Sequence, residues 1–363
     1  MKVLQLINCI ERGGGAEKFV LDLSLTLKKK GIDVEVLSLV PPSKNNSDFI
    51  DILKSAAIPT HFLPSHRVRS IRNYFLLNNF LRINYYDVIH VHLFPALYFC
   101  AFANLKGAKL LYTEHSTDNK RRHIRIFKLL DKIIYSRYNK IVCISEKVEE
   151  LLIKHIKLTN TIIIPNGIFV DDFFSAKELP FEELIGKGNE GEKIILMSAR
   201  MVKGKDYMTV FKALKRLPLD IHLLCLGTGG LENEYRNYCK DELLYKRVHF
   251  LGLRRNVNRI LKSADAIILS SEHEGFSLSM LEAMSSGNPF IASNVPGISD
   301  LVNGYAILFP LGDEQMLAEY IYKVLYDKDY RTEIIKRCQG FAKKYDIFIV
   351  SESYINLYVE LCE

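Results

Sequence analysis

The sequence predicts an α/β protein built from two doubly wound domains, and two observations lead to this expectation. Short apolar runs of strand length alternate with amphipathic stretches of helix length along the first 170 residues. The alternation starts again at residue 193, after a segment (169–191) whose proline and glycines are typical of a linker. A chain of 363 residues also has the length of two ordinary domains.

The expected strands are the apolar runs that precede each helical stretch. In the first half these runs are 3–8, 34–40, 58–63, 87–92, 109–114, 140–144 and 162–165. In the second half they are 193–198, 221–226, 248–251, 266–269, 289–292 and 306–308. Residues 346–362 predict a terminal helix with one apolar face, formed by Ile347, Val350, Tyr354, Leu357 and Leu361.

The composition is that of a globular, cytoplasmic protein. Hydrophobic residues make up 48% and charged residues 25% of the chain, and no apolar run reaches the length of a membrane span. The seven cysteines are scattered and contain no CxxC pair. This pattern indicates reduced thiols rather than disulfides or a zinc site.

The positive charge is concentrated in the first half. Residues 1–170 contain 25 lysines and arginines against 14 aspartates and glutamates, a net charge of +11, whereas the remainder has a net charge of −4. Much of the excess lies in the segments 67–82 and 120–140, which also contain aromatic and aliphatic residues. An anionic partner is therefore expected, either a membrane surface or a phosphate-bearing acceptor. No nucleic-acid-binding module accompanies the charge, so nucleic acid is not expected as a partner.

Two glutamates stand out in the second half, directly after the apolar run 266–269. Glu274 begins a turn, so it is expected at the carboxyl end of a buried parallel strand, where open α/β sheets bind ligands. Ser277 is expected to cap a short helix over residues 278–286, which carries Glu282 two turns further along.

Carboxylates beside the unpaired N–H groups of a helix start suit a polyhydroxylated ligand such as a sugar or a ribose. Most carboxylates in this position have another explanation, because they are solvated or stabilise the helix dipole. A pair of glutamates eight residues apart therefore does not identify a site by itself.

Basic and glycine-rich turns follow two other strands. Arg200 and Lys205 lie in the turn after the run 193–198. A guanidinium fork with a mobile ammonium group suits a diphosphate, although basic turns are usually just solvated.

Glycines 13–15 follow the first strand, but their spacing is not GxGxxG. They either let the backbone approach a ligand or form a simple tight turn.

Histidines lie at the ends of two strands of the first half. His90 and His92 alternate along one strand and face the same side of the sheet, but no third metal ligand lies nearby in the sequence. His115 follows the strand 109–114, where a single histidine is more often structural than catalytic.

The run Glu274-Gly275-Phe276-Ser277, with the later Leu281-Glu282-Ala283-Met284 and Gly287-Asn288-Pro289, resembles the donor-binding signature of retaining GT-B glycosyltransferases, and most closely that of glycosyltransferase family 4. The resemblance implies two Rossmann-like doubly wound domains that face a central cleft. Residues 1–170, completed by the helix 346–363, would bind the acceptor. Residues 171–345 would bind the nucleotide sugar.

The resemblance also implies a role for each matching residue. Glu282 would hold the donor ribose and Glu274 the transferred sugar, while Arg200 and Lys205 neutralise the diphosphate. His115 would touch the transferred sugar and complete the catalytic set, and the His90–His92 strand end would face the cleft. Further donor contacts are expected from Gly14, Gly15, Gly252, Leu253, Gly275, Phe276, Ser277 and Leu278.

The expected activity is therefore retaining transfer of a hexose from a nucleotide diphosphate sugar to a lipid-linked glycan. The pathway would be synthesis of a surface polysaccharide, such as lipopolysaccharide or capsule, at the inner face of the plasma membrane. No Asp-x-Asp motif lies in the turns expected to form the cleft, so no metal or other cofactor is expected. Two alternatives remain: a non-catalytic nucleotide-sugar-binding partner of another glycosyltransferase, and a nucleotide-sugar epimerase or phosphorylase of the same fold.

Overall fold

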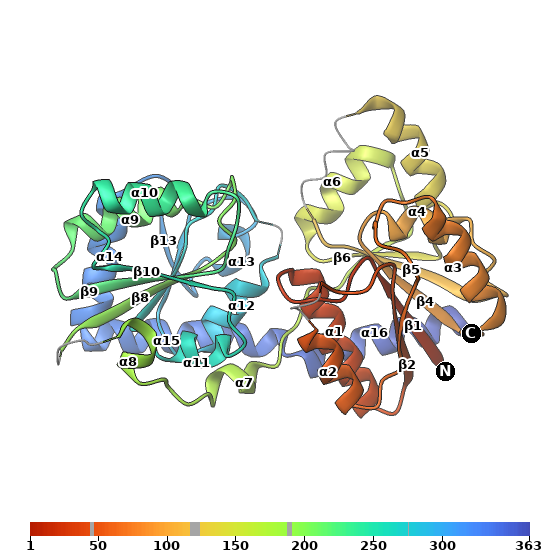
Figure 1. Ribbon diagram of the computed structural model, residues 1–363, viewed down its shortest axis with the longest axis horizontal. Coiled ribbons are helices and arrows are strands. Elements are labelled where there is room, and N and C mark those ends of the chain that lie inside the picture. The colour runs from red at the N-terminus through yellow and green to blue at the C-terminus, as the bar shows by residue number, and fades with distance from the viewer. Residues whose placement is uncertain (44–46, 117–123, 187–190, 275) are drawn as a thin grey trace. The chain divides into compact units, whose positions relative to one another are not determined.

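The computed structural model describes residues 1–43, 47–116, 124–186, 191–274 and 276–363 (Figure 1). The chain forms two compact units. Unit 1 comprises Met1–Gly167 and Ile347–Glu363, and unit 2 comprises Ile168–Asp346. Each unit has its own parallel sheet with interleaved helices, so the predicted α/β class is confirmed. The sequence placed the division at residues 170 and 171; the units divide at Gly167 and Ile168.

Unit 1 contains a seven-stranded parallel sheet in the order β3-β2-β1-β4-β5-β6-β7. Its strands are β1 (Lys2–Ile7), β2 (Asp33–Ser38), β3 (Thr60–Phe62), β4 (Val88–His92), β5 (Lys109–Glu114), β6 (Lys140–Cys143) and β7 (Thr161–Ile163). The central strands β1 and β4 are almost entirely buried, as expected for strands covered by helices on both faces.

The helices of unit 1 are α1 (Gly15–Lys29), α2 (Asp48–Ser55), α3 (Arg72–Ile83), α4 (Ala96–Ala101), α5 (Arg125–Tyr135), α6 (Glu146–Ile156) and α16 (Ile347–Cys362). The Ser145 hydroxyl caps α6 by accepting from the Val148 N–H. Helix α16, drawn in blue in Figure 1, packs against α1 although it ends the chain. It buries Tyr354, Leu357 and Tyr358 in the core of unit 1.

Unit 2 contains a six-stranded parallel sheet in the order β10-β9-β8-β11-β12-β13. Its strands are β8 (Lys193–Ser198), β9 (Ile221–Leu226), β10 (Val248–Gly252), β11 (Ala266–Leu269), β12 (Phe290–Ser293) and β13 (Ile307–Phe309). Its helices are α7 (Val170–Phe174), α8 (Phe181–Ile185), α9 (Tyr207–Arg216), α10 (Glu232–Asp241), α11 (Val257–Lys262), α12 (Leu278–Ser285), α13 (Ser299–Val302), α14 (Glu314–Tyr326) and α15 (Lys328–Ala342), with a 3₁₀ turn η2 (Lys343–Tyr345).

Both sheets reverse their strand order next to their first strand. The first strand of unit 1, β1, pairs with β2 on one side and β4 on the other. The first strand of unit 2, β8, pairs with β9 and β11 in the same way. Connections leave such a switch point in opposite directions and open a crevice at the carboxyl ends of the strands, where doubly wound sheets bind ligands. The candidate residues are found at these two places.

Candidate active site

The segments that follow β8 and β11 run beside one another in unit 2. Lys205 and Ser271 form an isolated backbone bridge, and the Glu272 N–H donates to the Gly204 carbonyl at 2.9 Å. The residue after Lys205 adds a second bond between the segments, since the Asp206 N–H donates to the Ser270 carbonyl, also at 2.9 Å. Residues that are far apart in the sequence are thereby fixed opposite one another at the switch point.

This pairing brings together two of the predicted catalytic residues, Lys205 and Glu274. The Lys205 ammonium group forms an ion pair with Glu274 Oε1, and both side chains are largely shielded from water. The Ser271 hydroxyl donates to the same oxygen at 3.1 Å. Glu274 Oε1 therefore accepts two hydrogen bonds from the protein, while no such bond to Oε2 is found among the described residues.

Several polar residues that the sequence did not single out hold the segments that carry this pair. Asp206 caps α9 by accepting from the Thr209 N–H at 3.1 Å, and it also accepts from the Ser270 hydroxyl at 3.0 Å. The Ser293 hydroxyl, at the end of β12, accepts from the Ser271 N–H and donates to the Ser271 carbonyl, at 3.0 and 2.7 Å. The only sequence signal for these roles is that each residue ends a strand or starts a helix.

Gly297 determines how closely the backbone at Glu274 can approach. Its φ is +86°, and a Cβ atom at this position would lie 2.0 Å from the Glu274 carbonyl oxygen. The Gly297 N–H also donates to Asp300 Oδ2 at 3.0 Å, which holds the turn in place. Both the conformation and the space exclude a larger residue here.

The signature helix α12 begins where the sequence predicts, with Ser277 as its N-cap residue. The Ser277 side chain makes no capping hydrogen bond; its hydroxyl contacts the Ser279 hydroxyl at 2.9 Å instead. Phe276 is buried, with its ring 5.0 Å from that of Tyr345. Glu282 lies half-buried on the helix, Leu278 is buried, and Gly275 lies outside the described residues.

Three other predicted donor contacts lie at the carboxyl ends of β8 and β10. Arg200 is exposed, and its side chain forms no hydrogen bond or ion pair within the part of the chain that the structure describes. Gly252 has a φ of +67° and accepts from the Gly227 N–H at 3.0 Å, which joins the loops after β9 and β10. Leu253 is 52% exposed. Arg200 and Leu253 thus present side chains that a ligand can reach.

The remaining predicted residues, Gly14, Gly15 and His115, belong to unit 1. Gly14 is the N-cap residue of α1, and a Cβ atom on it would lie 1.9 Å from Glu17 Oε2. The ring of Phe19, one turn into α1, lies 5.8 Å from the ring of His115. The glycine loop and His115 therefore share the carboxyl edge of the first sheet.

His90 and His92 face the same side of β4, but neither side chain is exposed at the end of the strand. Both residues are completely buried. His90 contacts Tyr358 Oη and Thr113 Oγ1 at 2.8 and 2.7 Å. His92 contacts Gln5 Oε1 at 2.8 Å and His115 Nε2 at 3.0 Å. Their ring nitrogens are used within unit 1, because the central strand of a doubly wound sheet is covered by helices.

His115 occupies a different environment at the end of β5. Burial lowers its pKa to about 3, so the imidazole is neutral at ordinary pH. Its Nε2 contacts His92, whereas its Nδ1 is buried without a hydrogen-bond partner among the described residues. A buried polar atom in this state is unusual and requires an explanation.

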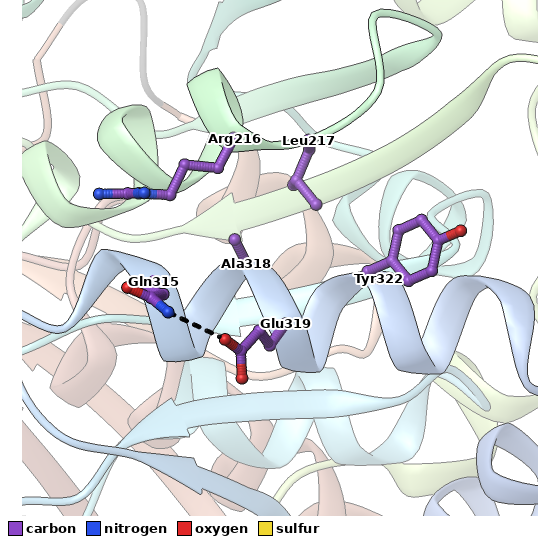
Figure 2. Close-up of a pocket in the computed structure, with 6 residues that line it drawn as sticks. All are labelled: Arg216, Leu217, Gln315, Ala318, Glu319 and Tyr322. Carbon is purple, nitrogen blue, oxygen red and sulfur yellow. Dashed lines mark hydrogen bonds between the residues drawn. The ribbon is translucent and has the colours of Figure 1, made fainter.

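A shallow pocket elsewhere in unit 2 is not the candidate site. Figure 2 shows its lining by α14 and by the end of α9, with Leu217, Ala318 and Tyr322 around it. It contains none of the predicted site residues. Among the described residues, no group of three or more His, Cys, Asp or Glu side chains is arranged to hold a metal ion.

Comparison with known proteins identifies the family. The family model described as Glycosyltransferase Family 4 matches residues 13–172, and the model described as Glycosyl transferases group 1 matches residues 181–340. Two parallel sheets with interleaved helices, one in each unit, form the GT-B fold. The chain belongs to the glycosyltransferases of family 4.

Individual relatives cover most of the chain. It is 27% identical over 308 residues to the UDP-Gal:alpha-D-GlcNAc-diphosphoundecaprenol alpha-1,3-galactosyltransferase of Escherichia coli, covering 78% of each protein. It is 23% identical over 367 residues to the phosphatidyl-myo-inositol mannosyltransferase of Mycobacterium leprae, covering 95% of this chain and 92% of the relative. The crystal structure of Anabaena HepE in complex with UDP-glucose superimposes with a TM-score of 0.85 at 18% identity, over 99% of this chain and all of the other, which shows the same fold.

The contact between Gly297 and Glu274 leads to a first prediction. Gly297→Ala should lower the free energy of unfolding by about 1–3 kcal/mol. The new methyl group displaces the Glu274 backbone, and an alanine backbone is strained at a φ of +86°. Gly304→Ala is the matched control, because Gly304 has a φ of +82° but no atom within 4 Å of the added Cβ. Urea unfolding measures both variants, and equal losses of stability would show that the Glu274 contact contributes nothing.

Proposed function

We propose that this protein transfers a hexose from a nucleotide diphosphate sugar to a lipid-linked glycan, with retention of configuration at the anomeric carbon. The observation that carries the proposal is the Lys205–Glu274 pair at the switch point of unit 2. A cation and a carboxylate in contact offer one group for a phosphate and one for a sugar hydroxyl. The relatives' names add support, since the Escherichia coli protein is named for a UDP-Gal donor and a diphosphoundecaprenol-linked acceptor.

The proposed chemistry needs groups that stabilise a departing diphosphate. The bond between the anomeric carbon and the phosphate oxygen breaks, and the acceptor hydroxyl oxygen bonds to that carbon from the same face. The acceptor proton passes to an oxygen of the leaving diphosphate. Lys205 and the exposed Arg200 compensate the charge that develops on this group, which is the interaction that would lower the barrier most. Glu274 would orient the sugar through the carboxylate oxygen Oε2.

The same residues motivate the proposal that turnover requires no divalent ion. Two cationic side chains beside the diphosphate supply the charge that a metal supplies in other transferases. Lys205 is held in place by Glu274, so its charge is already oriented before the donor binds.

Turnover in the presence of a chelator tests this proposal. Incubation with a panel of nucleotide sugars should give transfer, or slow donor hydrolysis without acceptor, that persists in excess chelator. Lys205→Ala should reduce the rate about 100-fold or more, since it removes a charge that stabilises the leaving group. The control Lys215→Ala removes a lysine of unit 2 whose partner is the exposed Glu242. Activity that requires added magnesium or manganese would contradict metal independence, and donor binding without any turnover would indicate the non-catalytic partner instead.

Glu282 is proposed to bind the donor ribose from its half-buried position on α12. Glu282→Ala should weaken nucleotide binding by about 1–3 kcal/mol, the size of a lost hydrogen bond to a charged group. Glu319→Ala, which changes the same charge on the exposed face of α14, is the control and should bind normally. Isothermal titration calorimetry with the nucleotide measures both. Unchanged affinity in a folded Glu282→Ala protein would refute the assignment.

We also propose that the acceptor is met at a membrane surface, where α5 would make the contact. Its outward face carries large apolar side chains: Ile126, Leu129 and Ile133 are 76%, 68% and 45% exposed. Lys128 and Lys132 on the same helix are exposed as well. An apolar face flanked by lysines is the pattern of a helix that lies in the interface of an anionic bilayer.

The inner face of α5 is fixed to the rest of unit 1. Asp131, which is 1% exposed, accepts from Tyr98 Oη and contacts His155 Nε2 at 2.9 Å. The helix therefore presents its apolar residues on a rigid support. The basic residues 120–123 that precede α5 lie outside the described residues. No helix in the described ranges combines the length and apolar character needed to cross a bilayer.

Vesicle flotation tests the membrane proposal. The protein should bind anionic liposomes at low salt and dissociate at high salt, because each lysine or arginine near the surface contributes about 1 kcal/mol that salt screens. The double variant Leu129→Glu with Ile133→Glu should not float. Leu219→Glu, at a residue of unit 2 that is 82% exposed, should float like the unmodified protein. Absence of binding at low salt would leave a soluble acceptor as the better interpretation.

A further inference from the structure

The core of unit 1 contains a series of hydrogen bonds that starts at His115, whose Nδ1 has no partner among the described residues, and passes through the C-terminal helix. In order, its members are His115, His92, Gln5, Tyr358, His90 and Thr113. They come from β5, β4, β1 and α16, and all except His115 are completely buried. We call these six residues the histidine chain. None of the roles proposed above for donor or acceptor binding uses Gln5 or Tyr358.

The donors and acceptors along the histidine chain follow from Gln5. Its amide nitrogen donates to Tyr358 Oη at 3.1 Å, so its oxygen faces His92 Nε2 at 2.8 Å. An amide oxygen only accepts, so His92 must be protonated on Nε2. Burial lowers the pKa of His92 well below its usual value, so the ring is neutral and its Nδ1 is an acceptor.

The same reasoning fixes His115. Its Nε2 lies 3.0 Å from the acceptor His92 Nδ1, so His115 Nε2 carries the proton and donates. His115 is also neutral, which leaves Nδ1 as a bare lone pair at the end of the histidine chain. The unpartnered atom is therefore an acceptor, and it suits the hydroxyl of a ligand.

The other end of the histidine chain continues in the same direction. Tyr358 Oη accepts from Gln5, so its own proton goes to His90 Nδ1 at 2.8 Å. His90 Nε2 then donates to Thr113 Oγ1 at 2.7 Å. Every bond runs in one direction, so reversing the Gln5 amide requires the tautomers of His90, His92 and His115 to reverse together with the Tyr358 and Thr113 hydroxyls.

We propose that Gln5 and Tyr358 are positioning residues that hold His115 in the Nε2-protonated tautomer, so that Nδ1 accepts a hydrogen bond from a hydroxyl of the sugar donor. The identity of that ligand rests on the proposed function; the tautomer does not. The C-terminal helix thereby acts on His115 through its own Tyr358 and two intervening side chains, Gln5 and His92. Tyr358 touches no reacting atom in this arrangement.

Removing the Tyr358 hydroxyl should release the Gln5 amide. In Tyr358→Phe, neither orientation of Gln5 is fixed, and the amide nitrogen is able to face His92. His92 would then be protonated on Nδ1 and donate to His115 Nε2, which moves the His115 proton to Nδ1. Tyr354→Phe is the matched control: Tyr354 lies on the same helix and its hydroxyl contacts Thr113 at 3.5 Å, but it has no hydrogen bond to Gln5.

Nitrogen-15 NMR of histidine-labelled protein measures the tautomers directly, because protonated and bare ring nitrogens have well-separated resonances. The protein has ten histidines, and His115→Asn identifies the signals of this ring. The unmodified protein and Tyr354→Phe should show a bare His115 Nδ1, whereas Tyr358→Phe should show a protonated Nδ1 or a mixture. A protonated Nδ1 in the unmodified protein overturns the proposal, even if Tyr358→Phe fails to fold.

The ligand part of the proposal has its own readout. Adding the nucleotide sugar should shift the His115 Nδ1 resonance in the unmodified protein, and Tyr358→Phe should lower kcat/KM for the donor about 3- to 10-fold. A bare Nδ1 that does not respond to donor would overturn the sugar contact. An inactive unmodified protein with the expected tautomer would contradict the proposed function rather than the positioning by Gln5 and Tyr358.

Discussion

The close approach of the segments after β8 and β11 is the constraint on which the candidate site of unit 2 depends. Parallel strands place all their carboxyl ends at one edge, and the reversal of strand order at β8 leaves room there. The backbone bridge between Lys205 and Ser271 then fixes the distance between two side chains of opposite charge. A lysine and a glutamate that are largely removed from water stabilise each other only when both remain in place, so the geometry of the bridge is also the geometry of the site.

This arrangement also explains which parts of the site were predictable. The strands, the signature helix and the positions of Lys205 and Glu274 follow from local patterns, since each is encoded in fewer than twenty consecutive residues. Gly297 is different, because its importance comes from a carbonyl oxygen 2.0 Å from where its Cβ would stand. Ser293 likewise acts on Ser271 across two neighbouring strands. Contacts of this kind depend on the tertiary pairing and leave no periodic signal in the sequence.

His90 and His92 show what a local pattern leaves open. Their alternation correctly placed them on one face of β4, but the sequence did not reveal what covers that face. The covering residues include Tyr354 and Tyr358, which lie more than two hundred positions later, and Gln5 on the neighbouring strand. An imidazole at a strand end is ambiguous until its partners are known, because the same side chain serves equally well as a buried structural group or as a ligand contact.

The two switch points use opposite electrostatic strategies. At β8 and β11, fixed charges are held ready by one another, which suits a ligand whose own charge is large and localised. At β1, β4 and β5, the polar groups are neutral, and burial keeps the histidines uncharged. A neutral chain of hydrogen bonds cannot attract an anion strongly, but it can distinguish a donor from an acceptor, because every proton in it has a fixed place. Such a group distinguishes a hydroxyl that donates from one that only accepts. If the proposed role of Tyr358 holds, the position of the His115 proton depends on a residue of the C-terminal helix that touches no ligand.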